Sequence, residues 1–492
     1  MPEETDLIIV KPASPQRMYG SLSLSLSGIE PPIFGIALAG FIRSKGYSVK
    51  VFDAETEGLD TETLATEIIK HNPLLVNIIV AGSNPSASST PLMVVTGEIL
   101  RELKKKSPSF KIILTGIHPS ALPERTLKEE KTDFVGKGES FYTVWRLLEA
   151  LKSGEKVREI KIRGLWYLKD GKLISGGWGE LVKNLDEIPL PAWDLLDMTK
   201  YRAHNWHCFG HLSQRSPYAV IYTSLGCPYN CSYCNIHAFY DGKPGIRFRS
   251  PEKIIEEIGL LVKNYGVKNI KFLDELFAIN EERIARLCDL IIERKYDLNI
   301  WAYARINTVD EAMLRKMKEA GINWLSYGIE SGSQKVRTGV DKLGFSQDQI
   351  KKVIKMTKDA GIYIMGNFIF GLPDDNLQTM QETFELAKEL NCEYVNFYMA
   401  MAYPGSRLYE EALKEGAELP KGWLGYAQLN EETLPLATKY ISGREVLSFR
   451  DKAFQEYYTN PKYLEMIEEK FGQEAVSHIN EMLKHEIRRK YI

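Results

Sequence analysis

The chain is poor in cysteine and nearly neutral, and it contains no long hydrophobic run. Six cysteines among 492 residues are too few for the disulfide framework of a small secreted domain. No apolar stretch approaches the roughly 20 residues of a membrane-spanning helix, and the first residues do not resemble a secretory signal peptide. A formal net charge of −2 gives no electrostatic reason to expect nucleic acid binding. We therefore expect a cytoplasmic protein with no transmembrane segment and no nucleic acid partner.

Three of the six cysteines lie together in one short run, as Cys227, Cys231 and Cys234. The spacing is Cys-x3-Cys-x2-Cys, and Tyr233 directly precedes the third cysteine. Three thiolates on one loop can ligate three irons of a 4Fe–4S cluster, whereas electron-transfer clusters normally use four cysteines. An iron without a protein ligand makes sense where another molecule must bind. The spacing therefore favours a reactive metal site, with these three residues as metal ligands and as the centre of catalysis.

This run resembles the signature of the radical S-adenosylmethionine (SAM) enzymes, Cys-x3-Cys-x-aromatic-Cys at the end of a first strand. The resemblance implies that the open iron binds the amino and carboxylate groups of SAM. It also implies that an electron from the cluster cleaves SAM to methionine and a 5′-deoxyadenosyl radical. The alternatives are a buried apolar cluster of cysteines or a zinc site, with His237 as a fourth ligand. Zinc sites usually have four ligands, as two Cys-x2-Cys pairs or cysteines with histidine partners, and the spacing here fits the cluster signature better.

Residues 1–155 alternate short β-branched runs with amphipathic stretches, a pattern typical of a parallel sheet covered by helices on both faces. Strands are predicted at 6–11, 48–53, 74–80, 110–115 and 132–135, and helices at 32–45, 61–71, 91–106 and 141–152. The fold class is therefore α/β, with a flavodoxin-like, doubly wound N-terminal domain. Ligands of such sheets bind at the carboxyl ends of the strands, which here are rich in glycine and small polar residues.

A flavodoxin-like domain directly before such a core resembles the cobalamin-binding domain of the cobalamin-dependent radical SAM class. The similarity is carried by Pro31-Pro32, Asp53-Ala54-Glu55, Gly116-x-His118-Pro119 and Gly136-x-Gly138-Glu139. It implies a cobalamin site formed by Asp53, Ser83, Asn84, Gly116, His118, Gly136, Gly138 and Glu139. The Asp-x-His-x-x-Gly motif that supplies a lower axial histidine in methionine-synthase-type domains is missing. We expect His118 to shape the pocket rather than to ligate cobalt, because a lone histidine is usually structural.

Residues 156–215 are predicted to form a hairpin and a linker. The hairpin spans 159–176, with a turn at Lys169-Asp170-Gly171. Residues 185–193 follow, and their prolines Pro189 and Pro191 make the connection semi-rigid. The Asp-x-Ile-Pro-x-Pro pattern of this segment resembles the linker of the cobalamin-dependent class.

Residues 216–408 return to strand–helix alternation with a longer period. Strands are predicted at 219–224, 270–273, 300–304, 324–328, 364–370 and 394–399, and helices at 252–264, 281–294, 310–319, 347–359 and 377–389. Repeated βα units build a parallel barrel with its site at the carboxyl ends of the strands. Six units match the partial (β/α)6 TIM-type barrel that the resemblance implies, with the cysteine loop after the first strand.

Polar residues follow several of these predicted strands. Carboxylates can accept hydrogen bonds from an ammonium group or from ribose hydroxyls, and arginine can pair with a carboxylate. The resemblance implies that such residues bind SAM together with the tyrosine of the cysteine run: Tyr233, Asp274, Glu275, Arg305, Glu330 and Ser331. The alternative is that the charged side chains simply pair with one another at the barrel mouth.

Residues 409–492 are rich in charge and helical patterning, which predicts a helical C-terminal cap without an auxiliary iron–sulfur cluster, since no cysteine lies there. Together the resemblances imply a methyltransferase that uses a 4Fe–4S cluster, SAM and cobalamin to methylate an unactivated carbon. One alternative is a cyclisation or rearrangement enzyme of the same class, and another is a cobalamin- or redox-sensing binding protein. Expected partners are a small-molecule, lipid, sugar or peptide substrate and a reducing protein such as flavodoxin or ferredoxin.

Overall fold

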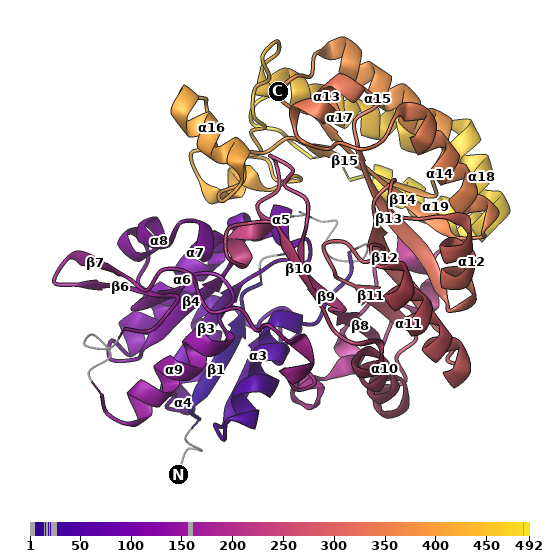
Figure 1. The fold of residues 1–492 in the computed structure, drawn as a ribbon. Helices are drawn as coiled ribbons and strands as arrows, with labels where there is room; N and C mark the ends of the chain where they lie inside the picture. The colour runs from indigo at the N-terminus through magenta and orange to yellow at the C-terminus, as the bar shows by residue number, and fades with distance from the viewer. Residues whose placement is uncertain are drawn as a thin grey trace.

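The computed structural model describes residues 5–13, 15, 18, 20, 27–155, 161–485 and 487–492. Two helix-covered sheets lie side by side, and further helices from the C-terminal part of the chain cover one end of the second sheet (Figure 1). The predicted α/β class, with a parallel N-terminal sheet followed by a second parallel sheet, is confirmed.

The N-terminal sheet has seven strands in the order β2-β1-β3-β4-β5-β6-β7. They are β1 (Leu7–Lys11), β2 (Val49–Asp53), β3 (Leu75–Val80), β4 (Ile112–Gly116), β5 (Phe134–Gly136), β6 (Leu165–Lys169) and β7 (Lys172–Ser175). The first five run parallel, because helical crossovers join them. The helices are α3 (Ile33–Ser44), α4 (Thr61–Lys70), α5 (Pro85–Ser88), α6 (Met93–Lys106), α7 (Ile117–Ala121), α8 (Pro123–Glu129) and α9 (Phe141–Lys152).

Alternate residues of β1 enter two different hydrophobic cores. Leu7 and Ile9 pack in the core that contains α3 and α9, whereas Ile8 and Val10 pack in the core that contains α4 and α6. Successive side chains of a strand point to opposite faces of the sheet. A strand covered by helices on both faces therefore needs consecutive apolar residues, and this continuous run made the strand predictable.

The predicted hairpin is present and extends the N-terminal sheet. Strand β6 pairs antiparallel with both β5 and β7. Residues 159 and 160, which the prediction included, lie outside the described residues. The structure thus joins the hairpin to the sheet of residues 1–155, whereas the sequence grouped it with the linker.

The linker packs against both halves of the molecule. Ala192 donates its backbone N–H to the carbonyl of Ile36 in α3 at 2.9 Å. Next to it, the buried indole of Trp193 donates to Glu257 of the helix α10 (Pro251–Tyr265) at 3.0 Å. These contacts explain why a proline-fixed segment can set the position of one sheet relative to the other.

The second sheet has six parallel strands in the order β15-β14-β13-β12-β11-β8, as expected for a partial barrel. The strands are β8 (Tyr218–Ile221), β11 (Asn269–Phe272), β12 (Asn299–Ala304), β13 (Ile322–Glu330), β14 (Tyr363–Phe370) and β15 (Tyr394–Met399). The helices between them are α10, α11 (Glu281–Arg294), α12 (Glu311–Glu319), α13 (Gln334–Gly339), α14 (Gln347–Asp359) and α15 (Leu377–Leu390).

The first barrel strand ends earlier than predicted. The sequence predicted a strand to residue 224, but β8 ends at Ile221 and the chain turns into β9 (Ser224–Cys227), which pairs antiparallel with β10 (Gly245–Phe248). The turn is held by Asp274, which accepts hydrogen bonds from the Thr223 backbone N–H at 2.7 Å and from the Ser224 hydroxyl at 2.6 Å. Beyond Ile221 these bonds to a side chain take the place of backbone hydrogen bonds to a neighbouring strand, and the chain turns toward the cysteine loop.

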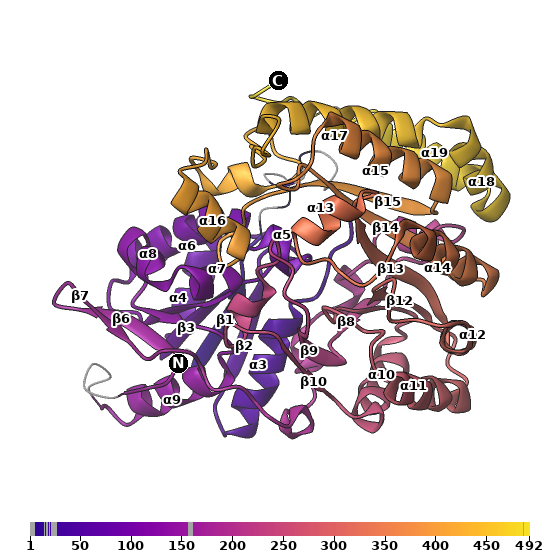
Figure 2. The ribbon, with the colours of Figure 1, turned by 45° about the horizontal axis from the view of Figure 1, so that its top comes forward.

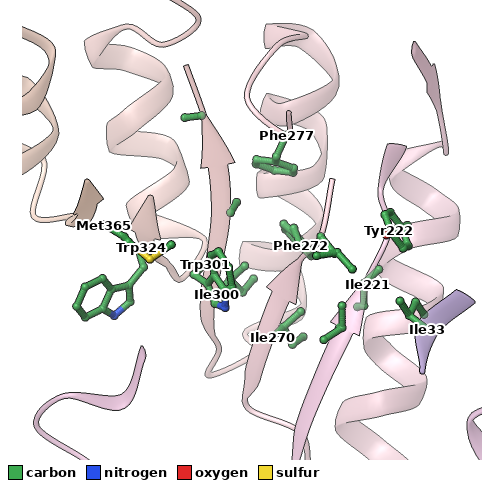
Figure 3. Close-up of a cluster of buried hydrophobic side chains, with 14 of the residues drawn as sticks. Ile33, Ile221, Tyr222, Ile270, Phe272, Phe277, Ile300, Trp301, Trp324 and Met365 are labelled. Carbon is green, nitrogen blue, oxygen red and sulfur yellow. The ribbon is translucent and has the colours of Figure 1, made fainter. Parts of the chain in front are cut away.

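The two sheets share one continuous hydrophobic core. Figure 3 shows part of it, with Ile33 of α3 close to Ile221 and Tyr222, and with Phe272 and Trp301 further along the barrel strands. A core that continues across the boundary favours a fixed arrangement of the two sheets.

The C-terminal region contains α16 (Arg407–Glu415), α17 (Gly443–Tyr458), α18 (Pro461–Phe471) and α19 (Gln473–Leu483). Figure 2 shows α17 running alongside β15, the last strand of the barrel sheet. There the hydroxyl of Tyr458 donates to the carbonyl of Val395 at 2.6 Å and accepts from its N–H at 3.1 Å. These two bonds pair backbone groups of β15, an edge strand, that no neighbouring strand pairs. Within the described residues, every helix is too short or too polar to cross a membrane.

Candidate active site

A cavity of about 300 Å³ lies at the carboxyl ends of the barrel strands, where the fold predicts a site. All three cysteines of the predicted signature line it, and so do Tyr233, Asp274, Glu275, Arg305 and Glu330. The remaining predicted SAM contact, Ser331, is fully buried beside the cavity, with its hydroxyl 3.0 Å from that of Thr383. The structure therefore brings together nearly all the residues predicted around the cysteine loop.

The three thiols suit a metal cluster in both position and chemistry. β9 ends at Cys227, and the loop that follows is fixed by a backbone bond from Ser232 to the carbonyl of Val340 at 3.1 Å. Burial raises the pKa of Cys227 to about 11 and that of Cys234 to about 12. Without a metal these two thiols would keep their protons at neutral pH, and metal binding would release them.

His237, the alternative fourth ligand of a zinc site, is engaged elsewhere. Its Nε2 lies 2.7 Å from the carbonyl oxygen of Tyr229, to which it donates a hydrogen bond. This bond closes the cysteine loop on itself. Across the described residues, no three His, Cys, Asp or Glu side chains converge closely enough to hold a single metal ion.

The acidic residues of the cavity form local pairs and also face the open space. Glu275 accepts from the Gly226 N–H at 3.0 Å and from the Tyr240 hydroxyl at 2.8 Å. Burial raises the pKa of its carboxyl to about 7, against the lowering effect of these hydrogen bonds. Glu330 accepts from the Tyr233 hydroxyl and from the Lys342 ammonium, each at 2.9 Å. Of the predicted residues, Glu330 forms an ion pair at the barrel mouth, whereas Glu275 has neutral partners; that these side chains bind SAM stays a prediction.

The N-terminal domain reaches the same cavity through the segment after β3. Asn84, Pro85, Ser86 and Ala87, at the start of α5, line it together with the cysteines. The Ser86 hydroxyl donates to the Asn235 side-chain oxygen at 2.6 Å, which links this segment directly to the residue after Cys234. Both ribbon views place α5 at the junction of the two sheets (Figures 1 and 2).

A second cavity of about 590 Å³ continues from the first into the barrel. The two share the wall residues Asn84, Ala87, Tyr303, Met365, Tyr398 and Gln428. Ser83 lines only the larger one, together with aromatic side chains of the barrel and residues of α17 and α19. The predicted cobalamin contacts Ser83 and Asn84 therefore stand at the wall of a large space that opens toward the cysteines.

The other predicted cobalamin contacts lie outside both cavities. Asp53 is buried and forms an ion pair with Lys11 at 3.1 Å, and it accepts a hydrogen bond from the hydroxyl of Tyr201 at 3.1 Å. Glu139 pairs with Arg247 at 2.6 Å and accepts from the Val182 N–H at 2.7 Å. Both carboxylates tie the N-terminal sheet to the linker or to β10.

The three predicted glycines are required by close packing. A Cβ atom at Gly116, whose φ is +115°, would lie 2.2 Å from the carbonyl oxygen of Val80. A Cβ atom at Gly138 would lie 2.4 Å from the carbonyl oxygen of Tyr240, and one at Gly136 would lie 2.9 Å from the Ser140 hydroxyl oxygen. Gly116 and Gly138 let backbone segments of the protein approach one another, whereas Gly136 makes room for the side chain of Ser140.

His118 is packed into the protein and does not line either cavity. Its side chain is 2 % exposed, Nδ1 lies 3.2 Å from the Thr90 hydroxyl, and Trp423 meets the ring edge-on with centroids 4.5 Å apart. Burial, with a smaller effect from the charge of Arg125, lowers the pKa of His118 to about 3. The residue thus acts as a neutral packing group at neutral pH.

This burial predicts a pH dependence of stability. The unfolded chain binds a proton at His118 below a pH of about 6.5, whereas the folded chain does not until about 3, so stability is lost as the pH falls through this window. The loss from this group approaches about 1.4 kcal/mol per pH unit. We expect the stability of His118→Gln, measured by urea unfolding between pH 5 and pH 7, to depend less on pH than that of the wild type. His211→Gln, at an exposed position, should keep the wild-type slope; equal slopes for all three proteins would contradict the assignment.

Several cavity residues were not predicted from the sequence. Lys342 lies in the loop after α13, and nothing in its local sequence marks it as a site residue. Asn367 is a polar residue within the apolar strand β14, which was a usable indication of an inward-facing role. Gln428 pairs with both backbone groups of Met399, at 2.9 and 3.1 Å, a contact across 29 residues that no local pattern reveals.

Comparison with protein families matches both halves of the molecule. The B12 binding domain matches residues 23–146, and the Radical SAM superfamily matches residues 221–387. An uncharacterized methyltransferase of Pyrococcus horikoshii, PH0819, is 32% identical over 89% of this chain and 90% of its own length. An anaerobic magnesium-protoporphyrin IX monomethyl ester cyclase of Rubrivivax gelatinosus is 27% identical over 80% of this chain and 68% of its own length.

A solved structure shows the same fold. The cobalamin-dependent SAM radical enzyme OxsB, with aqua-cobalamin and SAM bound, matches with a TM-score of 0.72 at 16% identity, over 97% of this chain and 71% of that chain. The fold and the cysteine-lined cavity define a two-sheet α/β enzyme whose three clustered cysteines lie at the carboxyl ends of its barrel strands. The chain belongs to the cobalamin-dependent radical SAM enzyme family.

Proposed function

We propose that this chain is a radical SAM methyltransferase that uses a 4Fe–4S cluster, SAM and cobalamin to methylate an unactivated carbon of its substrate. One observation carries the proposal. The three cysteine thiols and the Asn84–Ala87 segment of the N-terminal domain line the same cavity, which opens into a second, larger one. This arrangement supports a reaction in which a group held by the cysteines and a group held by the N-terminal domain act on one substrate.

When bound, the 4Fe–4S cluster, SAM and cobalamin would supply an electron, an organic radical and a methyl carrier. The residues of the chain would bind and orient them. Cys227, Cys231 and Cys234 would ligate three irons. Glu275 and Glu330 offer carboxylate oxygens to an ammonium group or ribose hydroxyls within the same cavity. Glu330 also fixes the hydroxyl of Tyr233, which places the tyrosine ring against the cavity next to the third cysteine.

The larger cavity is suited to a substrate whose inserted part is uncharged. Its wall includes the aromatic side chains of Trp206, Trp301 and Tyr394, which pack against one another and present an apolar surface. Each Lys, Arg or Asp on the described part of the wall already has a partner of opposite charge: Lys271 pairs with Glu30, and Arg450 pairs with Asp451. Asp451 is also shared with Arg489, and the wall carries His204, His478 and His485, so the preference for an uncharged group rests on the aromatic surface.

The domain contacts would hold the reacting groups at a fixed separation. Glu139 with Arg247, Lys271 with Glu30, and Ser86 with Asn235 all cross from the N-terminal domain to the barrel side. Orientation of two reactants by a stiff scaffold can supply a large part of a rate enhancement. We therefore assign Glu139, which was predicted as a cobalamin contact, to the positioning of the two domains.

A second candidate is a cyclase of the same class, favoured by the similarity to the magnesium-protoporphyrin monomethyl ester cyclase. It would use the same cysteine site without transferring a methyl group. The products separate the two functions, because SAM that donates its methyl group becomes S-adenosylhomocysteine, whereas SAM that is cleaved reductively yields 5′-deoxyadenosine and methionine.

The test uses protein loaded with iron, sulfide and cobalamin without oxygen, then supplied with reductant, methyl-labelled SAM and a small-molecule cell extract. We expect both S-adenosylhomocysteine and 5′-deoxyadenosine, with the label in a new product, measured by mass spectrometry. Formation of 5′-deoxyadenosine with an unlabelled product would favour the cyclase. Formation of neither nucleoside by fully loaded protein would contradict any radical SAM activity and would favour a binding role.

A further inference from the structure

Arg305 lies directly against the cysteine loop, at the end of β12. Its side chain is 4 % exposed, and Nη1 lies 3.9 Å from the Sγ of Cys231, within reach of an N–H···S hydrogen bond. The guanidinium also stacks on the ring of Tyr229, with its central carbon 4.0 Å from the ring centroid. Both contacts are made to the loop that carries the cysteines.

The rest of the guanidinium is held by neutral groups. Nε donates to the side-chain oxygen of Asn307 at 3.0 Å, and Nη2 donates to the backbone carbonyl of Leu343. Among the described residues, no carboxylate forms an ion pair with Arg305, whereas Lys342 in the same cavity pairs with Glu330. A buried cation without an anionic partner is costly. The structure therefore leaves the charge of Arg305 to be balanced by an anion near Cys231.

We infer that Arg305 is a positioning residue for the metal cluster: it donates a hydrogen bond to the sulfur of Cys231 and so raises the cluster's reduction potential. Thiolate sulfur that ligates iron carries negative charge, and hydrogen bonds to it are among the factors that set cluster potentials. A donated N–H and a nearby positive charge stabilise the reduced cluster, which has one more electron, over the oxidised one. This role differs from the pairing of Arg305 with the SAM carboxylate that the sequence analysis expected.

The geometry around Arg305 favours the sulfur over a distant ligand. Asn307, Leu343 and the ring of Tyr229 fix the guanidinium on three sides, so little rotation is left to reach elsewhere in the cavity. Planar stacking and forked donation are properties of arginine that lysine does not share. The conservative substitution to lysine therefore keeps the charge while losing the geometry.

The test is a redox titration of the anaerobically loaded protein without SAM, followed by electron paramagnetic resonance. The inference rests on the cluster assigned in the proposed function, so iron and sulfide are counted first. The count distinguishes a variant that has lost the cluster from one whose cluster has a changed reduction potential. We expect Arg305→Gln to shift the reduction equilibrium at least tenfold toward the oxidised cluster, a fall of about 59 mV for a one-electron couple. The affinity for SAM, measured separately, should change much less.

Arg407→Gln is the matched control. Arg407 pairs with the side chain of Asp341, whose backbone oxygen lies 3.9 Å from the same sulfur, but Arg407 itself is 42 % exposed and makes its ion pairs away from the sulfur. This variant should titrate like the wild type. A wild-type potential in fully loaded Arg305→Gln, or a large loss of SAM affinity at unchanged potential, would overturn the inference. If Arg305→Gln does not load the cluster, Arg305→Lys carries the test: it keeps the charge and loses the fixed N–H donor, so a smaller fall in potential is expected, and a wild-type potential would overturn the role of the hydrogen bond to the sulfur.

Discussion

Replacing Cys231 with alanine is expected to lower reductive SAM cleavage by at least about 10³-fold, because two thiols cannot hold the group that carries the chemistry. Cobalamin should remain bound, since Cys231 lies on the barrel side of the cavity and the N-terminal segment at Asn84 is untouched. The measurement is 5′-deoxyadenosine formation by anaerobically loaded protein, together with the absorption spectrum of bound cobalamin. Retained cleavage in this variant would count directly against the site.

Cys288→Ala is the control for the loss of a thiol. Cys288 is fully buried in α11, away from both cavities, and burial raises the pKa of its thiol to about 12. Its side chain serves packing alone. This variant should keep its iron content and its cleavage rate, even if it is slightly less stable.

Replacing Lys271 with methionine is expected to destabilise the protein by about 3–5 kcal/mol, because it leaves a buried carboxylate without its cation. Lys271 is 2 % exposed and donates to both carboxylate oxygens of Glu30, at 2.9 and 3.1 Å, and to the backbone carbonyl of Ser83 at 2.9 Å. Burial alone would raise the pKa of Glu30, but Lys271 and His204 hold it below its usual range. The measurement is the free energy of unfolding in urea at pH 7.5.

Two further variants isolate the ion pair. Lys268→Met removes the exposed pair with Asp297 and should cost at most about 1 kcal/mol, as is typical at the surface. The double variant Glu30→Leu, Lys271→Met removes both charges and should recover much of the loss. A Lys271→Met protein as stable as Lys268→Met would show that this pair does not hold the two domains together.

Most of the elements could be predicted from the sequence. Helices α11 and α14 and strand β15 have the predicted bounds. Their patterns are local: α14, for example, is preceded by its capping residue Ser346, whose side chain and that of Gln349 form a reciprocal cap. The cysteine cavity was also predictable, because the carboxyl ends of parallel strands must meet at one end of the barrel.

The roles of individual polar residues could not be predicted, because their partners are far away in the sequence. Asp53 bonds Tyr201, 148 residues on, and Glu139 bonds Arg247, 108 residues on. A position at the end of a strand indicates that a carboxylate lies near the binding edge of the sheet. Only the three-dimensional structure shows whether that carboxylate is already paired with a side chain of the protein. The same reason explains why Lys342 was missed and why His118 was placed at a pocket wall.

The central claim is that three cysteines hold a cluster of four irons, one of which is left open for SAM. Mössbauer spectroscopy of protein loaded with ⁵⁷Fe, in the absence of oxygen and with or without SAM, tests it most directly. We predict a 4Fe–4S spectrum in which one iron site, and only one, changes when SAM is added. A different cluster type, or four sites that do not respond to SAM, would contradict the account.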